Sequence, residues 1–267
     1  MTVTAHDAPA GPAAPAAPAA PRNGAAGRGS PLGLLVTPLL LAAACLALYL
    51  HINGQELDSI ETRALDREVI TRQLLEHLRL VGASTGLVIA LAIPLGVLLT
   101  RPGPARFAWP VLALANMGQA VPSIGVLVLL AVTVGIGFQQ ALIALVLVSV
   151  LPVLRNTMVG LRGVDRSLID AARGMGLTRT AVLLRVELPL AVPVMMAGLR
   201  IALILNVGSA TLATYTNAGG LGGLIDTGIS LNRTPVLLTG CVLTAVLALA
   251  CDWLIGLAER TLRPRGL

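Results

Sequence analysis

Residues 32–50 read LGLLVTPLLLAAACLALYL and carry no charged side chain. About 20 consecutive apolar residues are enough for a helix to cross the hydrocarbon core of a bilayer. Further apolar runs follow over residues 79–100, 108–134, 138–154, 190–212 and 236–256. Polar residues and Pro122 interrupt the long run 108–134, so its extent is the least defined of the set. The pattern predicts an all-α integral membrane protein, a multi-span helical bundle of about six transmembrane helices.

The amino-acid composition also excludes a soluble protein. Of the 267 residues, 55% are hydrophobic and only 12% are charged, and the mean hydropathy is +0.84. Soluble domains carry about 25% charged residues, so this chain lacks the charge for a soluble surface, and a soluble enzyme is excluded. All 19 basic residues are arginine. The absence of lysine also excludes a P-loop and a Schiff-base enzyme, because both need a lysine amine.

The arginines lie mostly in short segments between the apolar runs, and such an excess marks the cytoplasmic side of a membrane protein. We therefore expect both termini in the cytoplasm and the spans in a bacterial plasma membrane, since the Ala-rich, all-Arg composition is typical of GC-rich bacterial genomes. The net charge of +6 reflects topology, and we expect membrane lipid but no nucleic acid as a partner. The cysteines and histidines are scattered, without the spacing of a metal site or a disulfide framework.

Three segments fall outside the apolar runs. Residues 1–31 are mostly Ala, Pro and Gly and cannot bury enough apolar surface to fold, so we expect a disordered cytoplasmic tail. Residues 51–78 mix charged and apolar side chains at helical spacing, and Asp58 and Glu61 are suited to a capping box. We expect either an amphipathic helix at the extracytoplasmic membrane surface or a plain connector. Residues 261–267 form a short cytoplasmic tail.

The loop over residues 155–189 is long, basic and cytoplasmic in this topology, and reads RNTMVGLRGVDRSLIDAARGMGLTRTAVLLRVELP. Asp165 and Thr178 are suited to cap short helices, and Gly174 and Gly176 allow a left-handed turn between them. We therefore predict a helix, a tight turn and a second helix that project into the cytoplasm.

A few residues of this loop have a specific spacing. Asp170-Ala171-Ala172, then Gly176 after three residues and Val186-x-Leu188-Pro189 after nine more, resembles the EAA signature of ABC-importer permeases. That signature reads Glu-Ala-Ala, three residues, Gly, nine residues, Ile-x-Leu-Pro. Both gaps match, and the two departures, Asp for Glu and Val for Ile, are conservative. In addition, the two small alanine side chains would let another surface approach the backbone closely.

The resemblance implies a function for the loop. In ABC-importer permeases it is a coupling helix that docks in a groove on a separate ATPase subunit. The residues that would meet the ATPase are Asp170, Ala171, Ala172 and Gly176. Leu188 and Pro189 are interpreted as packing residues at the start of the next span. ATP would be bound by the partner subunit, and we expect no cofactor on this chain and no ATPase site of its own.

A wider set of strings resembles the permeases for osmoprotectants such as glycine betaine, carnitine and choline. They are Gln119-Ala-Val-Pro-Ser123, Leu151-Pro-Val-Leu-Arg-Asn156, Val164-Asp165, Val186-Glu-Leu-Pro-Leu190 and Ala218-Gly-Gly-Leu-Gly222. The resemblance covers about residues 73–260 and implies a MetI-like permease domain over residues 79–260. It also implies a second permease subunit, identical or related, and an extracytoplasmic substrate-binding protein. Residues 1–72, with the first span at 32–50, lie outside the matching strings.

Other classes of transporter remain as alternatives. Importers for methionine and amino acids share the EAA loop. A secondary transporter driven by an ion gradient would need ionisable groups deep in the spans, and only Arg200 and Asp252 come near. A membrane scaffold that transports nothing is the third alternative. The chain has only two residues each of Phe, Trp and Tyr, too few and too scattered for an aromatic cage around a quaternary ammonium ion. We therefore expect substrate selection on the separate binding protein.

Two groups of residues are candidates for the substrate pathway. Polar side chains at membrane depth usually face protein or a water-filled cavity, and here they are Asn116, Gln119, Ser123, Asn206 and Ser209, with Pro122 beside them. Pathway lining and interhelical hydrogen bonding are equal alternatives for these residues. The second group precedes the last apolar run and consists of Gly219, Gly220, Gly222 and Gly223. By resemblance it forms the outer mouth of the pathway, and a flexible surface turn is the alternative.

Overall fold

The computed structural model describes residues 31–262, and every regular element in that range is a helix. The elements are α1 (Pro31–Asn53), α2 (Ser59–Ala64), α3 (Arg67–Leu99), η1 (Pro104–Phe107), α4 (Ala108–Ala120), α5 (Ser123–Thr133), α6 (Phe138–Arg162), α7 (Arg166–Gly174), α8 (Arg179–Val182), η2 (Leu183–Glu187), α9 (Leu188–Ala210), η3 (Thr211–Thr216), α10 (Gly222–Ser230) and α11 (Thr234–Leu262). Within residues 31–262, five helical stretches are long and apolar enough to cross a membrane, or six if the bent pair α4–α5 is one span. This confirms the predicted all-α bundle. The expected tails fall almost entirely on residues 1–30 and 263–267, outside the described residues.

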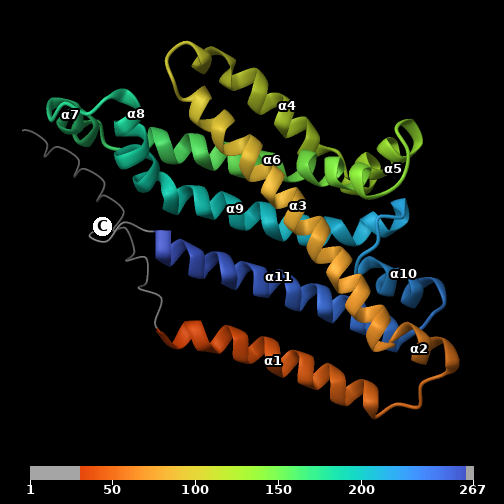
Figure 1. Ribbon diagram of the computed structural model, residues 1–267. Helices are drawn as coiled ribbons and strands as arrows, with labels where there is room; N and C mark the ends of the chain where they lie inside the picture. Colours follow the sequence, from red (N-terminus) through yellow and green to blue (C-terminus); the bar gives the residue numbers. More distant parts are fainter. Residues whose placement is uncertain (1–30, 263–267) are drawn as a thin grey trace, which may run out of the picture.

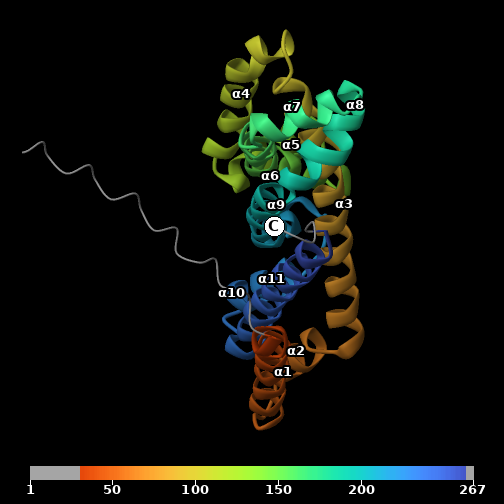
Figure 2. The same cartoon turned by 90° about the vertical axis from the view of Figure 1, so that its left-hand side faces the viewer.

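The long helices lie side by side in a row. In Figure 1 and Figure 2 the row runs α4, α6, α9, α11, α1, and α3 crosses one face of the α6–α9 pair. The short helices α7 and α8 project at one end of the row, where α1 begins and α11 ends. Helices α2, α5 and α10 lie at the opposite end (Figure 1). We call these two ends the α7 end and the α10 end.

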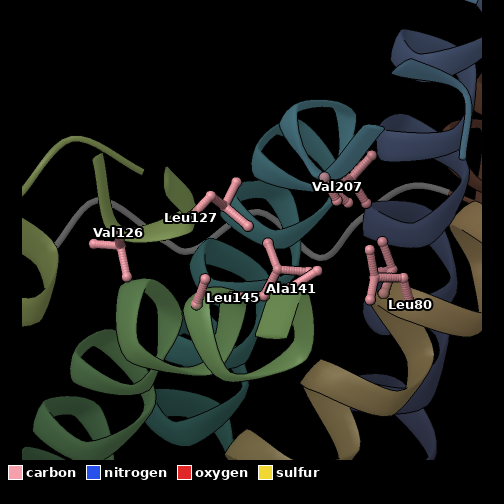
Figure 3. Packing of buried hydrophobic residues seen from close by; sticks show 10 residues of the cluster. Leu80, Val126, Leu127, Ala141, Leu145 and Val207 are labelled. Atoms are coloured by element: carbon pink, nitrogen blue, oxygen red, sulfur yellow. The ribbon is translucent and has the colours of Figure 1, made fainter. Parts of the chain in front are cut away.

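Glycines allow the two central helices, α6 and α9, to pack closely. A Cβ atom at Gly198 would lie 2.6 Å from the carbonyl oxygen of Pro152, and one at Gly160 would lie 3.1 Å from that of Ala191. Towards the α10 end, buried apolar side chains of four helices converge (Figure 3): Leu80 of α3, Val126 and Leu127 of α5, Ala141 and Leu145 of α6, and Val207 of α9. Because protein cores are close-packed, this contact fixes α3 and α9 against each other.

The apolar run 108–134 forms a bent pair of helices rather than one straight span. Helices α4 and α5 meet at an angle of 93°. Val121, between them, is extended (φ −76°, ψ 131°), because the ring of Pro122 disfavours the helical conformation at the residue before it. The pair is therefore a broken span or a re-entrant segment, which explains why the sequence did not define its extent.

The segment 51–78 is not one amphipathic helix. Asp58 and Glu61 form the predicted capping box of α2, in which each side chain accepts a hydrogen bond from the backbone of the other residue. Helix α3 then begins at Arg67 and continues unbroken into the second span. Its first turns belong to the bundle, because apolar side chains such as Leu74 pack against the start of α10. Part of the segment is thus an extension of the span and not a separate surface helix.

The outermost span of the row is α1. It packs against α11, and none of its most apolar window is buried within the described protein. Large apolar side chains are also exposed at the other edge, where Trp109 of α4 is 80% exposed and Val132 of α5 is 81% exposed. Such surfaces are stable only in contact with lipid or with another subunit.

Candidate functional site

The loop over residues 155–189 contains the two predicted short helices and the turn between them. Asp165 caps α7 by accepting a hydrogen bond from the backbone N–H of Ser167 at 2.9 Å. This bond and one from the Ser167 side chain hold the pKa of Asp165 below its ordinary value. Gly176 forms the turn with a φ of +85°, a left-handed conformation that favours glycine. Gly174 does not take part in the turn and is the last residue of α7.

The second short helix of the loop is continuous with the next span. Thr178 caps α8 as predicted and accepts a hydrogen bond from the backbone N–H of Ala181. Helix α8 passes through the π-helical segment η2 directly into α9, within one apolar stretch over Arg179–Thr216. Pro189 lies in the first turn of α9, as the sequence predicts, but α9 continues from η2 without a break. Its missing N–H donor therefore falls where the π-helical segment passes into α9. A displacement of the loop is consequently transmitted directly to α9.

Helix α7 presents an apolar face outward. Leu168 is 46% exposed and Met175 is 75% exposed, and Ala171 between them is exposed as well. The spacing of three and four residues places the three side chains on one face of a helix, which we call the α7 face. Ala172, by contrast, is buried within this chain at 3% exposure. The expectation that both alanines are open to a partner is therefore wrong for Ala172.

Asp170 is exposed on α7 and borders a cavity of about 580 Å³. The charged residues that line this cavity are Arg101, Arg162, Arg166, Asp170, Arg173 and Glu187. Arginines outnumber carboxylates there, so the protein surface next to α7 is positive. The α7 face and the exposed side chain of Asp170 are thus two candidate docking features of one short, projecting helix.

An ion pair joins the end of α3 to η2, the segment that connects the loop over residues 155–189 to α9. Arg101 follows α3, and its two terminal nitrogens donate to the two carboxylate oxygens of Glu187 in η2. The Glu187 side chain is 6% exposed, whereas that of Arg101 is 33% exposed. Bidentate pairs of this kind fix geometry as well as adding energy. The pair therefore ties α3 to the segment through which the loop meets α9.

The unequal burial of this pair predicts unequal effects of mutation. We expect Arg101→Ala to destabilise the protein by about 3 kcal/mol, because it leaves the buried carboxylate of Glu187 without a partner. Glu187→Gln is expected to cost about 1 kcal/mol, because the amide still accepts a hydrogen bond and the arginine reaches water. Thermal unfolding of both variants in the same detergent measures the difference. Equal losses in the two variants would contradict this assignment.

The glycine-rich stretch lies at the α10 end. Gly219 and Gly220 form a turn with φ of +78° and +100°, whereas Gly222 and Gly223 belong to the first turn of α10. A Cβ atom at Gly222 would lie 2.7 Å from the carbonyl carbon of Thr211. Such close packing against η3 argues against a flexible surface turn. We call residues 219–223 the glycine loop.

Three side chains from one face of α3 bind the backbone around the glycine loop. Glu76, His77 and Gln73 accept hydrogen bonds from the backbone N–H groups of Gly220, Leu221 and Leu224, at 3.0, 3.3 and 3.1 Å respectively. We call the three acceptors the α3 clasp. A cavity of about 420 Å³ borders the clasp and is also lined by Arg72, Arg79, Thr214 and Asn217.

His77 extends the clasp to α9. Its side chain is fully buried, and its Nε2 lies 3.2 Å from the carbonyl oxygen of Val207. Because Nδ1 accepts the hydrogen bond from Leu221, the proton of the neutral imidazole is placed on Nε2, which donates to Val207. The ring therefore bridges the loop and α9 only in its neutral form.

The polar pathway candidates are divided between helix contacts and exposed surface. Asn206 is fully buried and donates from its Nδ2 to the hydroxyl of Thr85 on α3 at 3.2 Å. The hydroxyls of Ser123 and Ser209 lie 3.1 Å apart and join α5 to α9. These residues form the interhelical hydrogen bonds that the sequence left as an alternative. Pro122 lies at the α4–α5 bend. Asn116 and Gln119 lie on α4, where Asn116 is exposed and Gln119 is half-buried.

The two ionisable residues noted within the spans pair with each other. Arg200 of α9 lies 2.9 Å from Asp252 of α11, and Glu259 lies 3.8 Å from the same guanidinium. Paired charges on adjacent helices contribute to helix packing. They do not provide the deep unpaired groups that an ion-coupled transporter uses.

Sequence reasoning missed the α3 clasp and the Arg101–Glu187 pair. Glu76 is 144 residues from its partner Gly220, and Arg101 is 86 residues from Glu187, so no local pattern connects them. The only sequence signal for the clasp is the spacing of Gln73, Glu76 and His77, which puts three hydrogen-bonding side chains on one face of a helix.

The amino-acid sequence of this chain is similar to those of known transport proteins. Residues 92–264 match the family described as "Binding-protein-dependent transport system inner membrane component". The chain is 42% identical over 233 residues to "Osmoprotectant import permease protein OsmY" of Salmonella typhimurium, which covers 87% of this chain and 95% of that protein. It is 39% identical over 196 residues to "Carnitine transport permease protein OpuCB" of Listeria monocytogenes, covering 73% and 88% of the two chains.

A solved structure shares the fold. The structure titled "Inward facing conformations of the MetNI methionine ABC transporter" superposes with a TM-score of 0.65 at 27% identity, covering 73% of this chain and 96% of that one.

The match to OsmY also leaves only 34 of the 267 residues uncovered, so it takes in most of the first span. The resemblance therefore reaches further toward the N-terminus than residues 73–260, where the sequence motifs lie. The chain belongs to the family of binding-protein-dependent transport system inner membrane components.

Proposed function

We propose that this chain is the transmembrane subunit of an ABC importer for osmoprotectants such as glycine betaine, carnitine or choline. The observation that carries the substrate class is the 42% identity to an osmoprotectant import permease across 95% of that protein's length. Similarity to a carnitine permease supports the same class. The fold alone does not identify the substrate class, because a methionine transporter shares it.

The proposed docking surface for the ATPase subunit is the α7 face together with Asp170. Leu168 on α7 and Met175, which directly follows α7, are large apolar side chains on a segment that projects from the bundle. Exposed apolar side chains of this kind are typical of contact with another protein. In this arrangement ATP binds to the partner subunit, and the chain itself holds no ATPase site.

The proposed topology places the α7 end in the cytoplasm. Helix α1 begins there and α11 ends there (Figure 1), so both termini of the chain would be cytoplasmic. The arginines of the α7 end fit this orientation, because arginine-rich segments stay on the cytoplasmic side. The α10 end would then face the extracytoplasmic binding protein.

A second permease subunit is proposed to complete the pathway. Asn116 and Gln119 are polar side chains on α4, an apolar helix whose outer surface is exposed in the single chain. Polar groups at this depth need protein or water around them. A partner permease, identical or related, on the α4–α5 side would supply both and would enclose a pathway between the two subunits.

The proposed cycle uses the continuity between loop and span. ATP binding closes the two ATPase subunits and draws the two α7 helices together. Because α8, η2 and α9 form one continuous helical stretch, this motion reaches the α10 end and opens it to the docked binding protein. Hydrolysis resets the permease. Each state requires different contacts with ATP and the binding protein, since a ligand shifts an equilibrium only through differential affinity.

Transport by the reconstituted complex tests the proposal. The chain, with its ATPase and binding protein, is placed in liposomes that contain ATP, and uptake of labelled glycine betaine, carnitine and choline is measured. We expect ATP-dependent uptake of at least one of them. Gly176→Arg should insert normally and abolish uptake, because a side chain at φ +85° strains the turn beside the α7 face.

Other outcomes point to the alternatives. Uptake of methionine or another amino acid in place of these compounds would overturn the substrate class. Uptake that follows an ion gradient without ATP would overturn the ABC mechanism.

A further inference from the structure

We propose that the α3 clasp of Gln73, Glu76 and His77 is the latch that keeps the extracytoplasmic gate closed, and that each transport cycle must release it. The inference rests on the proposed function. The solved structure that shares the fold is titled as inward-facing, and in an inward-facing importer the extracytoplasmic side is shut. In this protein the clasp is formed and joins α3 to the glycine loop.

The clasp holds the start of α10. No side chain of the segment itself caps this helix, whose first N–H groups have no partner one turn earlier. Gln73 accepts from Leu224 in the first turn of α10, and Glu76 and His77 accept from Gly220 and Leu221 just before it. A carboxylate such as Glu76 is favourable here because a helix N-terminus carries partial positive charge. Separation of α3 from the glycine loop therefore removes these acceptors from the start of α10.

Water can replace two of the three clasp contacts, those made by Gln73 and Glu76. The cavity of about 420 Å³ is lined by these two residues on one side and by Gly219, Gly220 and Gly223 on the other, whereas His77 is fully buried. Water that enters the cavity can hydrogen-bond both the carboxylate and the freed backbone N–H groups at little enthalpic cost. These two contacts are therefore suited to form and break reversibly.

The clasp is also connected to the coupling loop. His77 donates to the carbonyl oxygen of Val207, and Val207 lies in α9, the helix that continues from α8 and η2. A displacement of α7 that moves α9 therefore acts directly on one member of the clasp. The physical link is one continuous helix and one hydrogen bond, so no chain of intermediate residues is needed.

A disulfide across the clasp provides the direct test. A Cβ atom at Gly219 would lie 3.4 Å from the Cβ atom of Glu76, close to the separation of about 3.5–4.5 Å found in disulfides. The pair Glu76→Cys and Gly219→Cys is introduced into the full importer after Cys45, Cys241 and Cys251 have been replaced by serine. We expect oxidation to cross-link the pair and stop uptake, and reduction to restore it. Each single cysteine variant, treated identically, should be insensitive to oxidant.

A pair of substitutions at Glu76 separates a latch from a purely structural contact. Glu76→Leu removes the acceptor, and we expect ATP hydrolysis without binding protein to rise on the order of tenfold, as the loss of a charge-assisted hydrogen bond implies. Glu76→Gln keeps an acceptor but loses the charge, so it should raise the rate by less than Glu76→Leu. A structural role would instead lower hydrolysis with and without binding protein.

The outcomes are distinct from those that test the proposed function. Uptake that continues in the cross-linked pair, failure of the pair to cross-link, or unchanged or lowered hydrolysis in Glu76→Leu would each overturn the latch. A wild-type complex without ATP-dependent uptake would overturn the proposed function instead.

Discussion

Replacement of Met175 by Glu is expected to weaken strongly the association of this permease with its ATPase subunit. Met175 is 75% exposed, compared with 46% for Leu168 on the same face. A carboxylate buried there in the complex would have no partner, and the substitution also removes a large apolar contact. Residues at the centre of an interface typically contribute at least 2 kcal/mol, so we expect a loss in affinity of about thirtyfold or more. Co-purification of the ATPase with the tagged chain measures it.

Two control variants isolate the effect to the α7 face. Met175→Leu conserves volume and polarity and should retain the ATPase. Ile229→Glu introduces the same charge at an exposed apolar position of α10, at the other end of the bundle, and should also retain it. Recovery of the ATPase at wild-type yield with Met175→Glu would show that the α7 face is not the docking surface.

Replacement of Gly222 by Ala adds a single methyl group and is expected to destabilise the fold strongly. The new Cβ atom would overlap the carbonyl group of Thr211, whose carbon lies only 2.7 Å away. Because the opposing atoms are backbone, no side-chain rotation relieves the clash, and η3 or α10 must move. We expect a loss of at least about 3 kcal/mol, which corresponds to a fall of about 10 °C in the unfolding midpoint. Thermal unfolding of the purified chain in detergent measures it.

Gly82→Ala is the matched control for this substitution. Gly82 lies within α3, and a Cβ atom there would meet nothing within 4 Å. Alanine also favours a helix over glycine by about 1 kcal/mol, so Gly82→Ala should be neutral or stabilising. If both variants unfold at the wild-type temperature, the close approach of α10 to η3 is not a feature of the native fold.

The sequence predicts most of the fold because the decisive signals are local. The uncharged run 32–50 becomes α1. Asp58, Asp165 and Thr178 each cap the helix that follows them, since a cap depends only on residues within one turn. The spacing from Asp170 onward identified the family, which the match over residues 92–264 confirms. Periodicity, caps and short motifs are therefore enough for the class and the course of the bundle.

The remaining features depend on contacts between distant residues. Ala171 and Ala172 are adjacent residues of the same type, yet only Ala172 is buried. The difference arises because the orientation of α7 depends on its contacts with η2 and α8. The sequence leaves pathway lining and interhelical hydrogen bonding as equal alternatives for Asn206, until its partner on α3 is known. The role of His77 as a bridge between Leu221 and Val207 was not predicted either. Tertiary packing decides each of these cases, and a pattern in one segment does not contain it.

The central claim is that α7 couples this permease to a separate ATPase, and the stoichiometry of the purified complex tests it most directly. The tagged chain is purified in mild detergent and the intact assembly is weighed by native mass spectrometry. In the same cysteine-free background, a cross-linker is attached at Ala171→Cys, since Ala171 is exposed on the α7 face. If α7 docks on the ATPase, we expect one ATPase subunit per permease chain and a cross-link between the two. A permease that purifies alone, with no protein captured from position 171 in the presence of nucleotide, would contradict the account.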